Sequence, residues 1–287
     1  MRLDSHQHFW RYNETDYVWM SDAMEVLRHD HLPYDLEPKL RGIGFDGAIV
    51  VQARQMEQET QWLLELADEH AFIQGVVGWV DFASPRLDET LERFAANPKL
   101  KGVRELIHDM PDMDYSVSDV HTRAIAKLAP LGLTYDLLLK PQHLRPAAQL
   151  VRQFPNQPFV VDHIAKPGIE RAARQPWQTG LAALAAFENI YCKLSGMVTE
   201  AAWGNWRPET FRPYLDSVLE AFGAGRLMIG SDWPVCTLSG SYEATMGIVI
   251  DFANDLTCAE RDGILGNNAA YFYGVNRDTA NLCAAAK

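Results

Sequence analysis

Short apolar runs alternate with amphipathic segments along the whole of this 287-residue chain. Runs such as GAIVVQ, QGVVGWV and PFVVD are apolar on both faces, as parallel strands covered by helices are. Segments between them, such as QETQWLLELADEH, carry the apolar spacing of a helix that is buried on one side. About eight repeats of a strand followed by a helix predict a (β/α)8 TIM-type barrel.

The apolar runs give approximate bounds for the strands. We expect them at Arg2–His6, Gly47–Gln52, Gln74–Val80, Gly102–Ile107, Leu133–Leu138, Phe159–Asp162, Ile190–Leu194 and Leu227–Gly230. The sequence has no linker, low-complexity tract or break in composition, so we expect a single domain over residues 1–287. The segment Cys258–Lys287 is predicted to be a short C-terminal helical extension with a loose tail.

Charge and composition exclude several classes of protein. The formal net charge of −12 argues against nucleic acid as a partner, because phosphates require a basic face. No apolar run is long enough to cross a bilayer, and the four cysteines form no C-x-x-C pattern. We therefore expect a cytoplasmic protein without a membrane partner or an organic cofactor. A homo-oligomer is compatible with the sequence.

Ionisable residues gather at the carboxyl ends of the predicted strands, where barrels of this class place their sites. Asp4, His6 and His8 would share one face of the first strand, and His163 and Asp232 follow the sixth and eighth strands. Two imidazoles on one face can bind a metal ion or a substrate oxygen, and a carboxylate can act as a general base. The alternative is structural, with a hydrogen-bonded histidine pair and a carboxylate that stiffens the barrel.

A second set of residues at the strand ends is predicted to bind substrate. Arg104 either binds a substrate oxygen or neutralises the carboxylates of the site. Tryptophans near the barrel mouth suit the apolar face of a sugar-like ring, although each one alone is more typical of packing. The predicted substrate-binding residues are Arg54, Arg104, Lys140, Trp10, Trp79 and Trp233, with Trp203 and Trp206 in the loop after the seventh strand.

Four motifs carry a resemblance to a known family. The stretches DSHQHFW, VVDHIAKP, IGSDWPV and NNAAYFYG resemble the amidohydrolase superfamily, and more narrowly its branch of sugar-lactone hydrolases. The resemblance implies a distorted barrel that hydrolyses a cyclic ester, such as the aldonolactone of a 6-deoxy sugar like L-fucono-lactone or L-rhamnono-lactone. It also implies that Asp232 is the general base and that His6, His8 and His163 line the site.

The same resemblance limits the metal. A binuclear centre of this superfamily would need a lysine at the end of the fourth strand, where Arg104 and Glu105 stand instead. A mononuclear centre would add a histidine at the end of the fifth strand, where this chain has Lys140. The remaining ligands are His6, His8, His163 and Asp232. Because some members of the branch work without metal, one zinc or other divalent ion is compatible with the site but not required.

Three alternatives stay open. The substrate could be a lactone that carries carboxylates, for which Arg54, Arg104 and Arg207 would supply the cations. The enzyme could be a metal-dependent decarboxylase of the same superfamily, although the missing fifth-strand ligand counts against it. The chain could also be a sugar-acid binding protein without activity, which the joint presence of Asp232 and the histidines disfavours.

Overall fold

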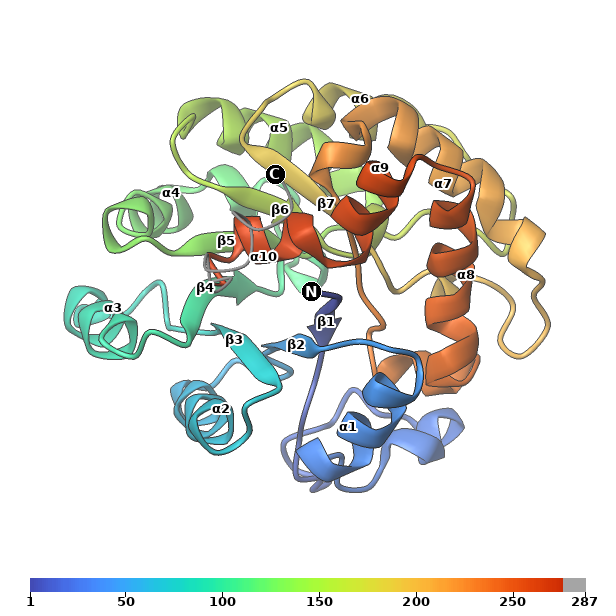
Figure 1. Cartoon of the computed structure of the whole chain (residues 1–287). Coiled ribbons are helices and arrows are strands. Elements are labelled where there is room, and N and C mark those ends of the chain that lie inside the picture. The colour runs from blue at the N-terminus through green and yellow to red at the C-terminus, as the bar shows by residue number, and fades with distance from the viewer. Residues whose placement is uncertain (276–287) are drawn as a thin grey trace, which may run out of the picture.

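The computed structural model describes residues 1–275, and in them eight parallel strands follow one another in chain order around a barrel (Figure 1). The strands are β1 (Leu3–Gln7), β2 (Gly47–Val51), β3 (Ile73–Gly78), β4 (Leu100–Glu105), β5 (Thr134–Leu137), β6 (Phe159–Val161), β7 (Ile190–Leu194) and β8 (Leu227–Ile229). Each predicted strand is confirmed, because the observed ends lie within two residues of the expected ones.

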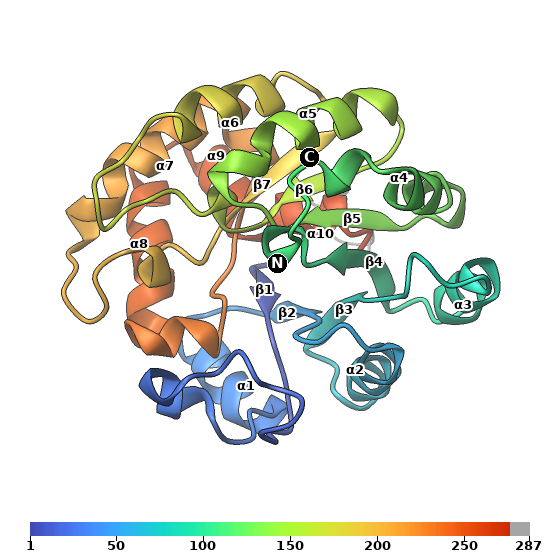
Figure 2. The ribbon, with the colours of Figure 1, turned by 180° about the vertical axis from the view of Figure 1, so that it is seen from behind.

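Helices surround the strands on the outside, as the views from both ends show (Figures 1 and 2). They are α1 (Pro33–Gly42), α2 (Glu57–Glu69), α3 (Leu87–Ala95), α4 (Asp119–Ile125), α5 (Leu144–Gln153), α6 (Trp177–Ala185), α7 (Pro208–Phe222) and α8 (Tyr242–Asn254). The architecture confirms the predicted (β/α)8 barrel. Over the described residues, none of the helices combines the length and apolar character needed to span a membrane.

The barrel closes between its first and last strands at their carboxyl ends. The backbone amide of Asp232 donates to His6 O at 2.8 Å, and the amide of His8 donates to Trp233 O at 2.7 Å. These bonds lie just beyond the end of β8 and form a parallel bridge between Gln7 and Trp233. Closure of the barrel therefore brings Asp232 beside the two histidines of the first strand.

A β-bulge in β1 changes which side chains face the barrel axis. Asp4 is paired with Ala48 and Gln7 with Val50, so one extra residue is inserted on β1. The Asp4 carboxylate accepts bonds from the Ser231 amide at 2.9 Å and the Tyr242 hydroxyl at 3.2 Å, away from the histidines. The expectation that Asp4 shares the face of His6 and His8 is wrong, because the alternation of side chains breaks at the bulge.

The interior of the barrel contains an apolar cluster and a cluster of charged side chains. The apolar cluster consists of Leu3, Ile49, Val51, Val77, Val160 and Met228 together with residues from the end of the described chain, among them Phe272 and Tyr273. Further along the axis, Tyr273 Oη donates to Asp136 Oδ2 at 2.9 Å. This bond joins the apolar part of the interior to the charged part.

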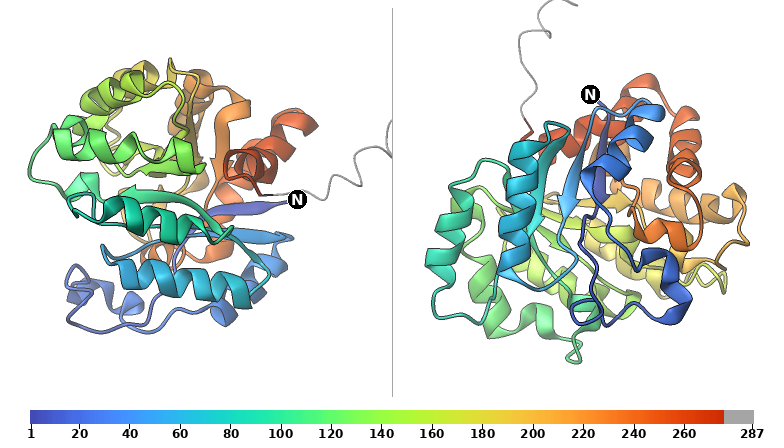
Figure 3. Two further views of the ribbon diagram at one scale, coloured as in Figure 1. Left: turned by 90° about the vertical axis from the view of Figure 1, so that its left-hand side faces the viewer. Right: turned by 90° about the horizontal axis from the view of Figure 1, so that it is seen from below.

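The C-terminal segment covers the amino end of the barrel. It consists of α9 (Cys258–Asp262), a π-helical turn (Gly263–Asn267) and α10 (Asn268–Phe272), at the same end of the barrel as the N-terminus (Figure 3). Asn268 Nδ2 donates to the carbonyls of Ala224 and Leu227 at 2.8 and 2.7 Å. The helices α9 and α10 confirm the predicted helical extension, whereas most of the loose tail expected after it falls beyond residue 275, outside the described residues.

Replacement of Gly266 by alanine is expected to destabilise the protein by about 1–3 kcal/mol, the usual cost of overpacking. An added Cβ would lie 2.2 Å from Met1 O and 2.8 Å from Leu3 N, so the π-helical turn could no longer pack against the start of β1. The measurement is denaturant unfolding. The control is Gly247→Ala in α8, where an added Cβ meets no atom within 4 Å and alanine favours the helix. Equal effects of the two substitutions would contradict this packing.

Candidate active site

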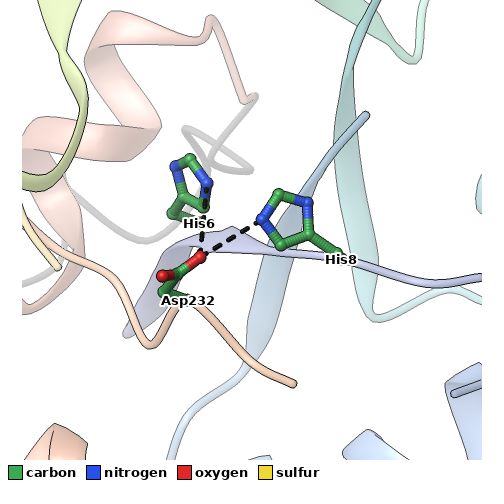
Figure 4. A group of neighbouring side chains, drawn as sticks. All are labelled: His6, His8 and Asp232. Atoms are coloured by element: carbon green, nitrogen blue, oxygen red, sulfur yellow. Dashed lines mark hydrogen bonds and ion pairs between the residues drawn. The ribbon is translucent and has the colours of Figure 1, made fainter. Parts of the chain in front are cut away.

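One carboxylate oxygen lies among three imidazole rings at the carboxyl end of the barrel. Asp232 Oδ1 is 3.2 Å from His8 Nε2, 3.8 Å from His163 Nε2 and 3.9 Å from His6 Nε2. Figure 4 shows His6 and His8 reaching this oxygen from β1 and from the residues just after it. All four side chains are buried, so the structure brings together the catalytic residues predicted from the sequence.

The backbone at this point is held in a conformation that residues other than glycine rarely adopt. Asp232 has φ of +58°, and the four residues from His163 to Lys166 all have φ between +47° and +59°. Each left-handed residue costs about 1–3 kcal/mol and persists only where the surroundings enforce it. Here the Trp177 indole donates to Ile164 O at 2.6 Å, and the amide of Lys166 donates to His163 O at 2.8 Å. Such strain is typical of functional sites.

The hydrogen bonds of His8 fit a cation at the site. His8 Nδ1 lies 2.8 Å from the carbonyl oxygen of Val51, which can only accept, so Nδ1 carries a proton. In a neutral ring Nε2 then has a bare lone pair, which faces the Asp232 carboxylate at 3.2 Å. Two acceptors at this distance require a positive charge between them, either a proton or a metal ion. His6, His8 and Asp232 also place ligand atoms within 4.8 Å of one another, a spacing that fits one divalent ion.

His163 is positioned by the loop after β7. Its Nδ1 is 2.9 Å from Ser195 Oγ, and its ring packs against Gly196, where an added Cβ would lie 2.5 Å from the ring. Burial lowers the pKa of His163 well below its ordinary value, despite the opposing effect of Asp232. Burial likewise lowers the pKa of His6. Both rings are therefore neutral near pH 7.

Asp232 is ionised in this environment. Burial alone would raise the pKa of its carboxyl group, but His163 and His8 outweigh burial and leave the pKa below its ordinary value. An ionised carboxylate that faces a cavity can accept a proton from water.

Two cations and two carboxylates form a buried charge cluster beneath the histidines. Arg104 Nη1 donates to Asp162 Oδ2 at 2.9 Å, and Lys193 Nζ lies 2.5 Å from Asp136 Oδ2 and 3.0 Å from Asp162 Oδ1. Burial raises the pKa of Asp136 to about 6, and Lys193 opposes that rise. Of the two roles considered for Arg104, these contacts favour neutralisation of a carboxylate.

A cavity of about 400 Å³ opens above Asp232. One part of its wall is polar, with His108, Asp109, Lys166, Thr199 and Glu200, and Lys166 Nζ is 3.1 Å from Glu200 Oε1. Another part is apolar and consists of Trp10, Trp19, Met24, Ala53, Leu106, Leu138, Trp203, Val235 and Leu238. The size and the mixture of polar and apolar wall residues suit a small molecule that carries both kinds of group.

Five of the residues predicted to bind substrate are not among the described residues that line this cavity, and one of them, Trp206, donates its indole N–H to Ser239 O at 2.8 Å. The Trp79 indole donates to Glu105 Oε1 at 3.1 Å, and Trp233 packs between Phe9 and His31. Arg54 forms ion pairs with Asp16 and Glu59, and Lys140 Nζ donates to His108 O at 3.1 Å. These residues follow strand ends as predicted, but each of them contacts other side chains or backbone groups of this chain and not the cavity.

The sequence analysis did not assign a role to several residues of the wall. Trp19 lies in the long loop after β1, and Thr199 and Glu200 follow β7 by several residues. Residues this far beyond a strand end cannot be placed at the cavity from the sequence, because the path of a loop depends on tertiary contacts. His108 and Asp109 lie closer to a strand end, and for them and for Lys166 the ionisable side chain was the available signal.

The chain belongs to the amidohydrolase family. The sequence model of that family matches residues 3–275. Two L-fucono-1,5-lactonases align with nearly the full chain. The protein from Burkholderia multivorans is 38% identical over 96% of both chains, and that from Burkholderia ambifaria is 34% identical over 98% of both.

Solved structures agree with this placement. A crystal structure of an amidohydrolase from Burkholderia multivorans with bound zinc has a TM-score of 0.92 and 38% identity, and the match covers 96% of this chain and all of that one. A probable 2-pyrone-4,6-dicarboxylic acid hydrolase from Acinetobacter baumannii, at 18% identity and a TM-score of 0.77, shares the fold. Its match covers 95% of this chain and 99% of that one.

Replacement of Gly196 by alanine is expected to displace the His163 ring. The control is Gly204→Ala, because both glycines have positive φ, +62° and +67°, but an added Cβ at Gly204 meets nothing within 4 Å. Both variants bear the left-handed strain, and Gly196→Ala is expected to lose about 1–3 kcal/mol more through overpacking. Thermal unfolding and the imidazole NMR signals of His163 test this. Unmoved signals in Gly196→Ala would refute the packing.

Proposed function

We propose that this protein hydrolyses the lactone of a neutral sugar acid, most favourably a 6-deoxy aldonolactone such as L-fucono-1,5-lactone, to the open-chain acid. The observation that carries the proposal is the ionised Asp232 carboxylate among three histidines on the floor of a cavity. Two full-length relatives that are L-fucono-1,5-lactonases support the choice of substrate class.

In the proposed mechanism Asp232 removes a proton from a water molecule that attacks the lactone carbonyl carbon. The C–O bond to the ring oxygen then breaks, and protonated Asp232 delivers the proton to that oxygen. His163 stabilises the negative charge on the carbonyl oxygen. If the Ser195 hydroxyl donates to His163 Nδ1, the single ring proton lies on Nε2, on the side of Asp232.

A divalent ion fits the same site. His8 Nε2, His6 Nε2 and Asp232 Oδ1 would hold it, and when bound it would polarise the carbonyl oxygen of the substrate. Arg104 is a poor donor to that oxygen, because all four hydrogens on its two terminal nitrogens are used by Gln52, Asp162 and His6.

The charges of the wall support a neutral substrate. The described wall contains one arginine, Arg104, and one lysine, Lys166. Each of them already forms an ion pair with a carboxylate of the protein. Asp109, Glu200 and Asp232 add negative charge to the same wall. A substrate with two carboxylates would find no unpaired guanidinium or ammonium among the described wall residues, and its desolvation would be uncompensated.

The cytoplasm is the proposed compartment. Cys192 and Cys236 are buried, and within residues 1–275 neither forms a disulfide, which is typical of a reducing environment.

Asp232→Asn is expected to lower kcat by about 10²–10⁴-fold, the range for loss of a general base, while the variant still binds substrate. The matched control is Asp109→Asn, which alters a carboxylate of the cavity wall that pairs with His108 at 3.0 Å. We expect Asp109→Asn to keep more than about a tenth of the wild-type kcat, because this substitution does not remove the general base. If Asp232→Asn does the same, Asp232 is not the base.

A substrate comparison tests the charge argument. We expect kcat/KM for L-fucono-1,5-lactone or L-rhamnono-lactone to exceed that for 2-pyrone-4,6-dicarboxylate lactone by at least about tenfold, equivalent to about 1.4 kcal/mol. The assay measures acid release at constant pH. A preference for the dicarboxylate would refute the argument from the paired cations.

A further inference from the structure

Arg104 is fixed on β4 by bonds from every hydrogen of its terminal nitrogens. Nη2 donates to Gln52 O at 2.5 Å and to Gln52 Oε1 at 3.2 Å. Nη1 donates to Asp162 Oδ2 at 2.9 Å and to His6 Nε2 at 3.2 Å. The side chain is buried, so these bonds hold the guanidinium in one orientation, directed at the ring of His6.

His6 lies between two cationic side chains. Lys193 Nζ is 3.1 Å from His6 Nδ1, and Arg104 Nη1 is 3.2 Å from His6 Nε2. A neutral imidazole has one lone pair, so only one of the two cations can donate to the ring; we assign the proton to Nδ1, which faces Asp162 Oδ1 at 3.3 Å, and the lone pair to Nε2, where Arg104 donates. That lone pair is the one a metal ion beside Asp232 and His8 would require, and Arg104 already uses it.

We propose that Arg104 and a divalent cation compete for His6 Nε2, so that Arg104 weakens metal binding in this chain. The three atoms that would hold the ion are His6 Nε2, His8 Nε2 and Asp232 Oδ1. While Arg104 is bonded to His6 Nε2, the other two atoms remain available to the ion. The guanidinium also places a fixed positive charge beside the carboxylate site, where a second cation is repelled. The inference concerns the affinity for metal alone and does not depend on the proposed lactonase activity.

The test measures the Kd of zinc for the chelator-stripped full-length protein by competition with a chromogenic chelator. Arg104→Gln is expected to tighten zinc binding by at least about tenfold, within the range that residues contacting a metal ligand exert. The control is Arg54→Gln, which removes the same charge from a residue outside the described cavity wall and should leave the Kd unchanged. In a His6→Asn background, Arg104→Gln should give a clearly smaller gain, because only the charge repulsion is relieved and no ligand nitrogen is released.

Removal of Arg104 leaves Asp162 with one cation fewer, and the variant could fail to fold. The double variant Arg104→Gln/Asp162→Asn keeps the buried charge balanced and is expected to show the same tightening. Thermal unfolding without zinc reports whether each variant is folded. A zinc Kd that is unchanged or weaker in the folded variants would overturn the proposal, as would an equal gain in Arg54→Gln. Because no lactone is present, this result is independent of whether Asp232 is a general base.

Discussion

The pairing of Arg104 and Lys193 with Asp136 and Asp162 inside the barrel is the constraint on which the site depends. Breaking a buried ion pair by removing one partner costs about 3–5 kcal/mol, so the four groups must be kept together. They come from β4, β5, β7 and the residue after β6, and their bonds therefore also fix how these strands lie against one another. Both cations also lie beside the His6 ring, with Lys193 Nζ 3.1 Å from Nδ1 and Arg104 Nη1 3.2 Å from Nε2.

The fold and the centre of the site could be predicted because both depend on local patterns. Continuous apolar runs mark parallel strands, and a charged residue at the end of such a run is costly unless it has a role. That reasoning found His6, His8, His163 and Asp232, which the structure places around one oxygen atom. The barrel then brings together strand ends that are far apart in the sequence.

The cavity wall could not be predicted in the same way. Arg54, Trp79 and Trp233 stand at strand ends, but ion pairs, an indole hydrogen bond and ring packing hold them elsewhere. Trp19 and Glu200 reach the cavity from loops, whose paths are set by contacts that no short stretch of sequence contains. The position of Asp4 depended on a single extra residue in β1, which no pattern of alternation reveals.

The bridge between the first and last strands has a consequence for how the protein is made. His8 and Asp232 are separated by 224 positions, so the two halves of the site emerge from the ribosome at very different times during translation. During most of translation β1 lacks its neighbour from β8 and the cover of the C-terminal turn, and the backbone groups along that edge are unpaired. We therefore expect assembly of the active site to be among the last events of folding, because a nascent chain that stalls before Asp232 lacks half of the site.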